Sequence, residues 1–333
     1  MDPAARVQLG RTRVALTRLG LGTAPLAGLF RPTPESDAAA AIERAYALGI
    51  RYFDTAPLYG SGLAEERLGR ALLAKPRASF VVSTKVGRLL RAGAPPDATQ
   101  YHDGEPFFKD APPLNPIFDF SYDGVMRSLE ESLARLGLDR VDLLYIHDPD
   151  AHYQEAREGA YKALDGLRAA GTLGAVGVGM NHWEPLAQFA READFDAFML
   201  AGRYTLLDQS ARAELLPLCA AKGIAVVAAG VYNSGILADP HTKARYDYVP
   251  APPPLVARAL RLEAVCRRWG VPLKAAAAQF PFTHPAVTAV VLGCRTATDV
   301  AENAALMQLP IPGGLWTELA GEGLLPAEGI PQT

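Results

Sequence analysis

Four titratable side chains of different kinds lie directly behind short apolar segments of the chain. Asp54 and Lys85 each follow such a segment, His147 follows a third, and Tyr59 comes five residues after Asp54 in a turn with proline and glycine. Short apolar runs rich in β-branched and aromatic residues favour buried strands. If the strands are parallel neighbours, these four side chains converge on one rim. The segments are 50–53, 80–84 and 143–146.

A carboxylate, an amine, a phenol and an imidazole at one rim could reduce a carbonyl or oxidise an alcohol. A carbonyl that accepts a hydride becomes an alkoxide and needs a proton donor, and the reverse reaction needs a base. The Tyr59 phenol titrates at about 10 in water, and an ammonium such as Lys85 lowers that pKa. Asp54 could hold Lys85 charged, and His147 could donate a hydrogen bond to the substrate oxygen. Taken singly, each residue also has an ordinary structural role. Asp54 could cap a helix, Lys85 could be solvated, the Tyr59 ring could serve packing, and His147 could be a structural histidine.

The residues around this set resemble a signature of the aldo-keto reductases. The match covers 49–60 and continues to Glu65 and Gly69, and similarity extends from about residue 14 to about residue 307. Within the family, 202–209 and 181–184 are similar to bacterial aldose dehydrogenases acting on L-fucose, D-threo-aldose or galactose. Pyridoxal 4-dehydrogenases are close relatives of that group. The resemblance implies Tyr59 as the proton-transfer residue, with Asp54, Lys85 and His147 as its catalytic partners.

The resemblance also implies a nicotinamide cofactor, NAD or NADP, because no side chain supplies a hydride. The family's last cofactor segment corresponds to 292–303, where a helix N-terminus meets phosphate. Three positions that contact the nicotinamide in the family differ in this chain. The usual Ser-Asn pair is Gly179-Met180-Asn181, and the usual Gln is Ala201, with Arg203 nearby. The aromatic residue that usually stacks on the nicotinamide is Ala229, and Tyr232 could stack there instead. The candidate cofactor residues are Gly22, Thr23, Asp54, Asn181, Arg203, Tyr232, Gly293, Arg295, Asp299 and Asn303.

Two of these positions bear on the choice between NAD and NADP. Family members that use NADP place Lys and Arg where this chain has Gly293 and Asp299. A carboxylate near the adenosine ribose repels a 2′-phosphate and can accept a hydroxyl hydrogen bond instead. Arg295 argues the other way, because it could swing onto the phosphate. We expect NAD to be used at least as well as NADP.

The substrate side is expected in the long connection 86–120, and 231–254 is expected to be a second long loop. The first is rich in proline, glycine and aromatic residues, and a connection of this length is usually functional or mobile. We interpret it as a lid over the site, with a disordered insertion as the alternative. Tyr59, His147 and Asp148 are the candidate substrate-binding residues, Asp148 for a sugar hydroxyl.

The periodicity that surrounds these residues alternates strand and helix about eight times, which predicts parallel pairing with helical crossovers. A closed (β/α)₈ barrel places functional residues at the carboxyl ends of its strands. An open doubly wound sheet is the alternative, but no G-x-G-x-x-G follows the first strand. We expect one barrel domain over 1–333, preceded by a β-hairpin.

The composition of the chain excludes several kinds of binding partner. The chain has 333 residues and a formal net charge of −3, which argues against nucleic acid. Its three cysteines are scattered, so we expect a reducing, cytoplasmic compartment and no cysteine-rich zinc site. The residues 147–150 lack metal-ligand spacing, so no metal is expected. Neither a secretory signal nor a membrane segment is expected, and the chain should be a monomer or homodimer acting on a small sugar or aldehyde.

The sequence therefore leaves several functions open. An NAD(P)-dependent aldose 1-dehydrogenase that oxidises C1 to a lactone is the first. A pyridoxal 4-dehydrogenase or a general aldehyde or ketone reductase is the alternative enzyme. A non-catalytic redox-sensing subunit, as in the potassium-channel β subunits of the same fold, is the alternative outside catalysis.

Overall fold

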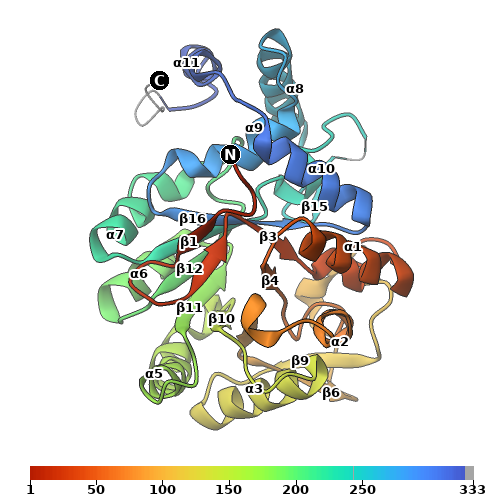
Figure 1. Ribbon diagram of the computed structural model, residues 1–333, viewed down its shortest axis with the longest axis vertical. Helices are drawn as coiled ribbons and strands as arrows, with labels where there is room; N and C mark the ends of the chain where they lie inside the picture. Colours follow the sequence, from red (N-terminus) through yellow and green to blue (C-terminus); the bar gives the residue numbers. More distant parts are fainter. Residues whose placement is uncertain (243, 327–333) are drawn as a thin grey trace.

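Eight parallel strands close into a barrel in a computed structural model that describes residues 1–242 and 244–326 (Figure 1). Around the barrel the strand order is β10-β11-β12-β13-β16-β3-β4-β5, so each strand pairs with its neighbours in the chain. This confirms the predicted (β/α)₈ barrel. The strands are β3 (Leu19–Gly22), β4 (Tyr52–Asp54), β5 (Val81–Val86), β10 (Leu143–His147), β11 (Ala175–Met180), β12 (Ala197–Ala201), β13 (Ala225–Ala229) and β16 (Val287–Gly293).

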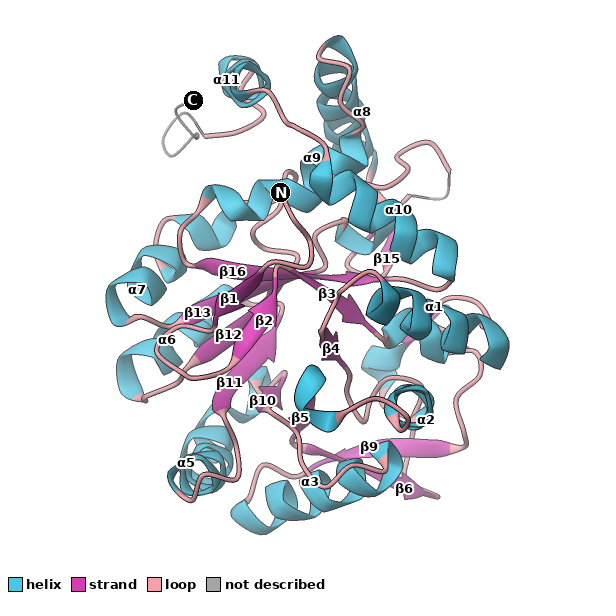
Figure 2. Cartoon of the chain, in the orientation of Figure 1, coloured by secondary structure: helices cyan, strands magenta, loops and turns pink. Residues whose placement is uncertain are grey.

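The helices lie outside the strands, as Figure 2 shows. They are α1 (Glu35–Ala47), α2 (Leu63–Leu72), α3 (Tyr122–Leu136), α4 (Tyr153–Glu155), α5 (Tyr161–Ala169), α6 (Trp183–Glu192), α7 (Leu215–Lys222), α8 (Pro253–Arg268), α9 (Leu273–Gln279), α10 (Ala297–Gln308) and α11 (Gly313–Gly321). In the described part of the chain, none of them combines the length and apolarity that crossing a membrane requires.

A short hairpin closes the end of the barrel where the strands begin. It consists of β1 (Arg6–Gln8) and β2 (Ala15–Thr17), which pair antiparallel. Leu9 and Leu16 are fully buried, and they pack in one cluster with the inward-facing side chains Tyr52, Leu143 and Tyr145. The hairpin therefore fills this end with apolar atoms and leaves the opposite end for polar chemistry.

Alternation along β5 sends polar side chains to both of its faces. Ser83 and Lys85 are two residues apart, so they share the inner face of the barrel, whereas Thr84 points outward. The Thr84 hydroxyl donates to Glu65 of α2 at 2.6 Å, and Arg135 of α3 donates to the same carboxylate at 2.7 Å. Because Glu65 is fully buried, this part of the family signature secures the helices against the strand that carries Lys85.

The long connection after β5 has more regular structure than the sequence indicated. Strand β6 (Arg88–Ala92) pairs antiparallel with β9 (Leu114–Phe118), and a smaller hairpin of β7 (Tyr101–His102) and β8 (Glu105–Pro106) lies between them. Phe108 also forms a β-bridge with Leu29, in the connection after β3. The second connection contains β14 (Arg245–Tyr246) and β15 (Val249–Pro250). Backbone pairing, which residue spacing does not reveal in irregular stretches, orders both segments.

Candidate active site

A cavity of about 480 Å³ opens at the carboxyl ends of the barrel strands. Asp54, Tyr59, Lys85 and His147 all line it, so the structure brings the four predicted residues together. They come from β4, the turn after it, β5 and β10, which are adjacent in the barrel. The volume lies within the range of about 300–1,000 Å³ that is usual for small-molecule sites.

A buried ion pair forms the floor of this cavity. Lys85 Nζ lies 2.8 Å from Asp54 Oδ2 and donates to the Thr55 carbonyl at 2.8 Å. The other carboxylate oxygen accepts from Ser83 Oγ at 2.7 Å, and Ser83 in turn lies 3.0 Å from the Tyr52 hydroxyl. The side chains of Lys85 and Asp54 are only 2% and 3% exposed. A buried charge is costly unless it is paired and hydrogen-bonded, and this network supplies both a partner and hydrogen bonds to each group.

Tyr59 lies above the ion pair and between two other rings. Lys85 Nζ is 4.7 Å from the centre of its ring. Phe108 stacks at 6.2 Å between centroids, and His147 meets the ring edge-on at 6.1 Å. Burial raises the pKa of Tyr59 well above its ordinary value, and the charge of Asp54 adds to this effect. The sequence predicted that Lys85 would lower the pKa of Tyr59, but the structure gives the opposite direction. Asp54 balances the charge of the ammonium, so the effect of burial prevails and the phenol keeps its proton.

His147 is neutral in this environment. Burial lowers its pKa well below the ordinary value, and the cations Arg88 and Lys85 lower it further. Its Nδ1 is buried without a hydrogen-bond partner in the described residues, and Nε2 lies 3.4 Å from Asp148 Oδ2. Nε2 is therefore the nitrogen available toward the cavity, which Asp148 also lines.

The other candidate residues divide between the wall of the cavity and its support. Those on the wall are Gly22, Asn181, Tyr232, Gly293, Arg295, Asp299 and Asn303. Thr23 lies behind the wall, where its backbone N–H and its hydroxyl both donate to the Asp54 carbonyl at 3.0 Å. Arg203 is directed to Asp247, with Nη2 2.8 Å from Oδ2, so its guanidinium is paired there instead of facing the cavity. Thr23 and Arg203 thus form hydrogen bonds with Asp54 and Asp247 and do not line the cavity.

The residues after β16 form one end of the cavity. Asp299 Oδ2 accepts from the backbone N–H groups of Arg295 and Thr296 at 2.9 and 3.1 Å, and so caps α10. The Arg295 guanidinium donates to the carbonyls of Pro25 and Leu29 at 3.0 and 2.7 Å. These bonds fix Arg295 against the connection after β3.

The cavity wall fits a flat, extended cofactor. Small residues from three consecutive strand ends, Gly179, Ala201 and Ala229, line its middle and leave room for a ring. Asn233 also lines it and is buried, and its Oδ1 has no hydrogen-bond partner in residues 1–242 and 244–326. Such an acceptor is costly unless a ligand or water meets it. Tyr232 donates its hydroxyl to Asn303 at 3.0 Å, which fixes its ring at the wall.

Sequence reasoning missed several residues of the cavity and its surroundings. Tyr248, Asn233 and Lys274 line the cavity, and Arg88 donates to Asp148 at 3.1 Å. A signal existed for Arg88, which lies three residues beyond Lys85 in the chain. No comparable signal marked the other three, because long connections or helices carry them.

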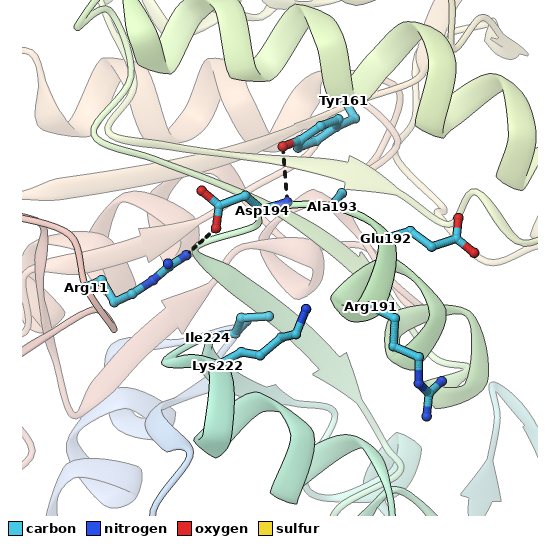
Figure 3. A pocket seen from close by; sticks show the side chains of 8 residues that line it. All are labelled: Arg11, Tyr161, Arg191, Glu192, Ala193, Asp194, Lys222 and Ile224. Carbon is cyan, nitrogen blue, oxygen red and sulfur yellow. Dashed lines mark hydrogen bonds and ion pairs between the residues drawn. The ribbon is translucent and has the colours of Figure 1, made fainter.

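A second cavity lies at the opposite end of the barrel, before β12 and β13 (Figure 3). Its cations already have partners. Arg11 pairs with Asp194 at 2.6 Å, Arg191 pairs with Glu214, and Lys222 Nζ donates to the Ala190 carbonyl at 2.6 Å. This cavity contains none of the four predicted catalytic residues, so the candidate active site is the cavity around Tyr59.

Comparisons with known proteins agree with this placement. The model of the aldo/keto reductase family matches residues 18–319. The chain is 46% identical over 316 residues to a D-threo-aldose 1-dehydrogenase from a Pseudomonas species, covering 94% of this chain and 96% of the relative. It is 44% identical over 339 residues to a pyridoxal 4-dehydrogenase from Microbacterium luteolum, covering 95% and 97%.

Among solved structures, a glycerol dehydrogenase from Gluconobacter oxydans superposes with a TM-score of 0.74 at 21% identity, covering 99% of this chain and 97% of the other. This likeness supports the barrel fold alone. The family match and the two curated relatives extend along nearly the whole chain. The chain therefore belongs to the aldo/keto reductase family of NAD(P)-dependent oxidoreductases.

Proposed function

We propose that this enzyme is an aldose 1-dehydrogenase, which oxidises C1 of an L-fucose-, D-threo-aldose- or galactose-type sugar to a lactone. The observation that carries the proposal is the 46% identity to a D-threo-aldose 1-dehydrogenase along nearly the whole chain. The cavity supports it, because a phenol, an imidazole and a carboxylate from Asp148 share one wall. A sugar needs both a proton acceptor at C1 and polar partners for its other hydroxyls.

The chemistry assigned to the chain is proton transfer at the substrate oxygen. A nicotinamide cofactor bound in this cavity would supply the hydride chemistry, which no side chain can provide. Tyr59 exchanges the proton with the substrate oxygen, as base in oxidation and as acid in reduction. Lys85 stabilises the phenolate, which takes up the substrate proton in oxidation and is left behind when Tyr59 gives up its proton in reduction, and Asp54 keeps Lys85 at its place. His147 orients the substrate oxygen by a hydrogen bond from Nε2. Small residues such as Ala201 and Ala229 leave room for the cofactor, and Asn233 offers it an acceptor.

Oxidation of pyridoxal is the second candidate, and two observations favour it. A pyridoxal 4-dehydrogenase is 44% identical to this chain. The cavity also has aromatic walls, because Phe107 and Phe108 line it and Phe108 stacks beside Tyr59. Flat aromatic surfaces suit a pyridine ring as well as the apolar face of a sugar.

A substrate panel separates the two candidates. Formation of reduced cofactor is followed by its absorbance with L-fucose, D-arabinose, L-galactose and pyridoxal, each with NAD and with NADP. The proposal expects kcat/KM for at least one of the sugars to exceed that for pyridoxal. A clear preference for pyridoxal would replace the proposal by the second candidate.

Asp148→Ala should weaken discrimination between epimeric sugars. The carboxylate lines the cavity and its side chain is 30% exposed, so we propose that it accepts a hydrogen bond from one sugar hydroxyl. A site built to bind a hydroxyl rejects the epimer that leaves its polar group unpaired, so the kcat/KM ratio of L-galactose to L-glucose should fall by about tenfold. Asp139→Ala, at an exposed carboxylate, is the control. An unchanged ratio in the Asp148 variant would contradict this role.

We propose that NAD is used at least as well as NADP. Asp299 lines the cofactor end of the cavity, and its charge would repel a 2′-phosphate. Arg295, which could have opposed this, is bound to the connection after β3. Lys274 also lines this end, but its Nζ lies 2.7 Å from Glu302, so its charge is balanced.

Asp299→Arg should shift the NADP to NAD ratio of kcat/KM by about tenfold, or about 1.4 kcal/mol. Because Asp299 forms the capping box of α10 together with the N-cap residue Thr296, the substitution also costs stability, typically about 1 kcal/mol. Asp299→Asn keeps an oxygen for the cap while removing the charge, so it should give a smaller shift with better retained stability. A wild-type preference for NADP of more than tenfold would contradict the proposed repulsion between Asp299 and the 2′-phosphate.

A further inference from the structure

A second ion pair, between a buried arginine and a partly exposed carboxylate, lies beside His147, as the pair of Lys85 and Asp54 lies beside Tyr59. Arg88 Nη2 donates to Asp148 Oδ2 at 3.1 Å, and the Arg88 residue is only 4% exposed. Its Nε and Nη1 are buried without hydrogen-bond partners within the described chain. A buried guanidinium with a single carboxylate partner is energetically demanding, so this placement calls for a functional reason.

The backbone places Arg88 behind the catalytic residues. Gly87, directly after β5, has a φ of +103°, and a Cβ at this position would come within 2.2 Å of the Phe120 ring. Only glycine suits both the conformation and the space. The turn lets the chain leave the barrel strand and enter β6 with Arg88 still inside. The guanidinium then lies over the Phe118 ring at 5.0 Å.

Asp148 is held in an unusual conformation next to His147. Its φ is +43°, in the left-handed region, and its N–H donates to the Gly179 carbonyl at 3.0 Å. In this position Oδ2 lies 3.4 Å from His147 Nε2 while it accepts from Arg88. One carboxylate oxygen therefore lies between the guanidinium and the imidazole.

We infer that Arg88 is a positioning residue: it holds the Asp148 carboxylate beside Nε2 of His147, so that the imidazole keeps its proton on the nitrogen available toward the cavity. The use of that proton for the substrate oxygen rests on the proposed function. The placement of the proton itself does not, and it can be measured without substrate. A carboxylate 3.4 Å from Nε2 favours the tautomer with hydrogen there, because a bound hydrogen carries a positive partial charge whereas a bare nitrogen lone pair would be repelled.

Arg88 also sets the charge balance around the imidazole. The charged and titratable groups that face His147 are Arg88, Lys85, Asp148 and Tyr59, and the charge of Lys85 is balanced by Asp54. Burial raises the pKa of the Asp148 carboxyl and lowers that of His147, and the charge of Arg88 acts to lower both. Without this cation both pKa values rise. Asp148 then loses charge at a higher pH, and His147 gains it at a higher pH.

The experiment is a pH titration of ¹⁵N-labelled histidine side chains by NMR, in the enzyme without substrate. The chain has six histidines, and a His147→Asn variant identifies the relevant signal. The wild type should show neutral His147 with its proton on Nε2. Arg88→Gln should raise the pKa of His147 by about one unit, whereas Arg88→Lys, which keeps the charge, should raise it less. Arg91→Gln, in the same strand but paired with Glu131, is the matched control.

Two results would overturn the inference: a proton on Nδ1 of His147 in the wild type, or an unchanged His147 pKa in folded Arg88→Gln. If that variant does not fold, Arg88→Gln combined with Asp148→Asn leaves no unpaired charge and takes its place, and it should lose the Nε2 preference. An enzyme inactive on all substrates but with the expected titration would contradict the proposed function and leave the positioning role standing. In an active enzyme, kcat/KM of the double variant should equal that of Asp148→Asn alone, because Arg88 acts through Asp148.

Discussion

Tyr59→Phe should lower turnover by about 10²-fold or more, which is the range for loss of a general acid–base group. The variant keeps the ring that packs on Phe108 and His147 and removes only the hydroxyl. Cofactor affinity, followed by the fluorescence of reduced cofactor, should therefore change little. Tyr46→Phe, at a half-buried tyrosine of α1 that bonds Ser79, is the matched control and should keep full turnover. Near-normal turnover of Tyr59→Phe would remove Tyr59 from the mechanism.

The pH dependence of the oxidation and reduction rates provides a second test of the role of Tyr59. Because burial raises the pKa of Tyr59, the phenol keeps its proton through neutral pH and beyond its ordinary pKa of about 10. Reduction uses the protonated form, so its kcat/KM should not fall on account of Tyr59 below that pH. Oxidation uses the deprotonated form, so its rate should rise with pH across the alkaline range. Tyr59→Phe should lose this rise.

Lys85→Met should reduce both activity and stability. The substitution removes the cation 4.7 Å from the Tyr59 ring, so the phenolate loses its stabilisation and turnover should fall by about 10²-fold or more. It also leaves the buried Asp54 carboxylate without its partner, which typically costs about 3–5 kcal/mol of folding free energy. Turnover and chemical denaturation of the purified variant measure the two effects.

A double variant separates the two effects of Lys85. Adding Asp54→Asn to Lys85→Met removes the unpaired charge while keeping an oxygen that can accept from Ser83, as Asp54 does at 2.7 Å. Stability should recover in large part, whereas turnover should stay low because the cation is still missing. If turnover recovered together with stability, Lys85 would be a structural residue and its assignment to catalysis would be wrong.

Local sequence was sufficient for the barrel because each strand and helix is marked by its own residues. The run 143–146 is apolar and β-forming. Helix α3 is preceded by the N-cap residue Ser121, whose side chain accepts from the Gly124 N–H, and is followed by the C-cap residue Gly137 with a φ of +62°. Caps, turns and periodicity act over a few residues, so they can be read without knowledge of the fold. The order of the strands then follows from short right-handed crossovers.

The long connections could not be read in the same way. Within 86–120, β6 pairs with β9 across some twenty residues, and Phe108 reaches Leu29 from a different part of the chain. Such pairing depends on which segments the barrel brings together. The aromatic residues did predict that the segment is more than a disordered insertion, and Phe107 and Phe108 do line the cavity. Their partners were not predictable.

The sequence by itself determined that an acid, a phenol, an amine and an imidazole follow the strands of one barrel, because strand ends and residue types are local properties. Only the tertiary structure decided how the remaining charged side chains are used. Arg295 and Arg203 were both candidates for the cofactor, yet Arg295 bonds Pro25, 270 residues away, and Arg203 bonds Asp247. Arg88 instead meets Asp148 across 60 residues. A long flexible cation pairs with whichever oxygen the folded chain places within reach, so its partner is a property of the fold.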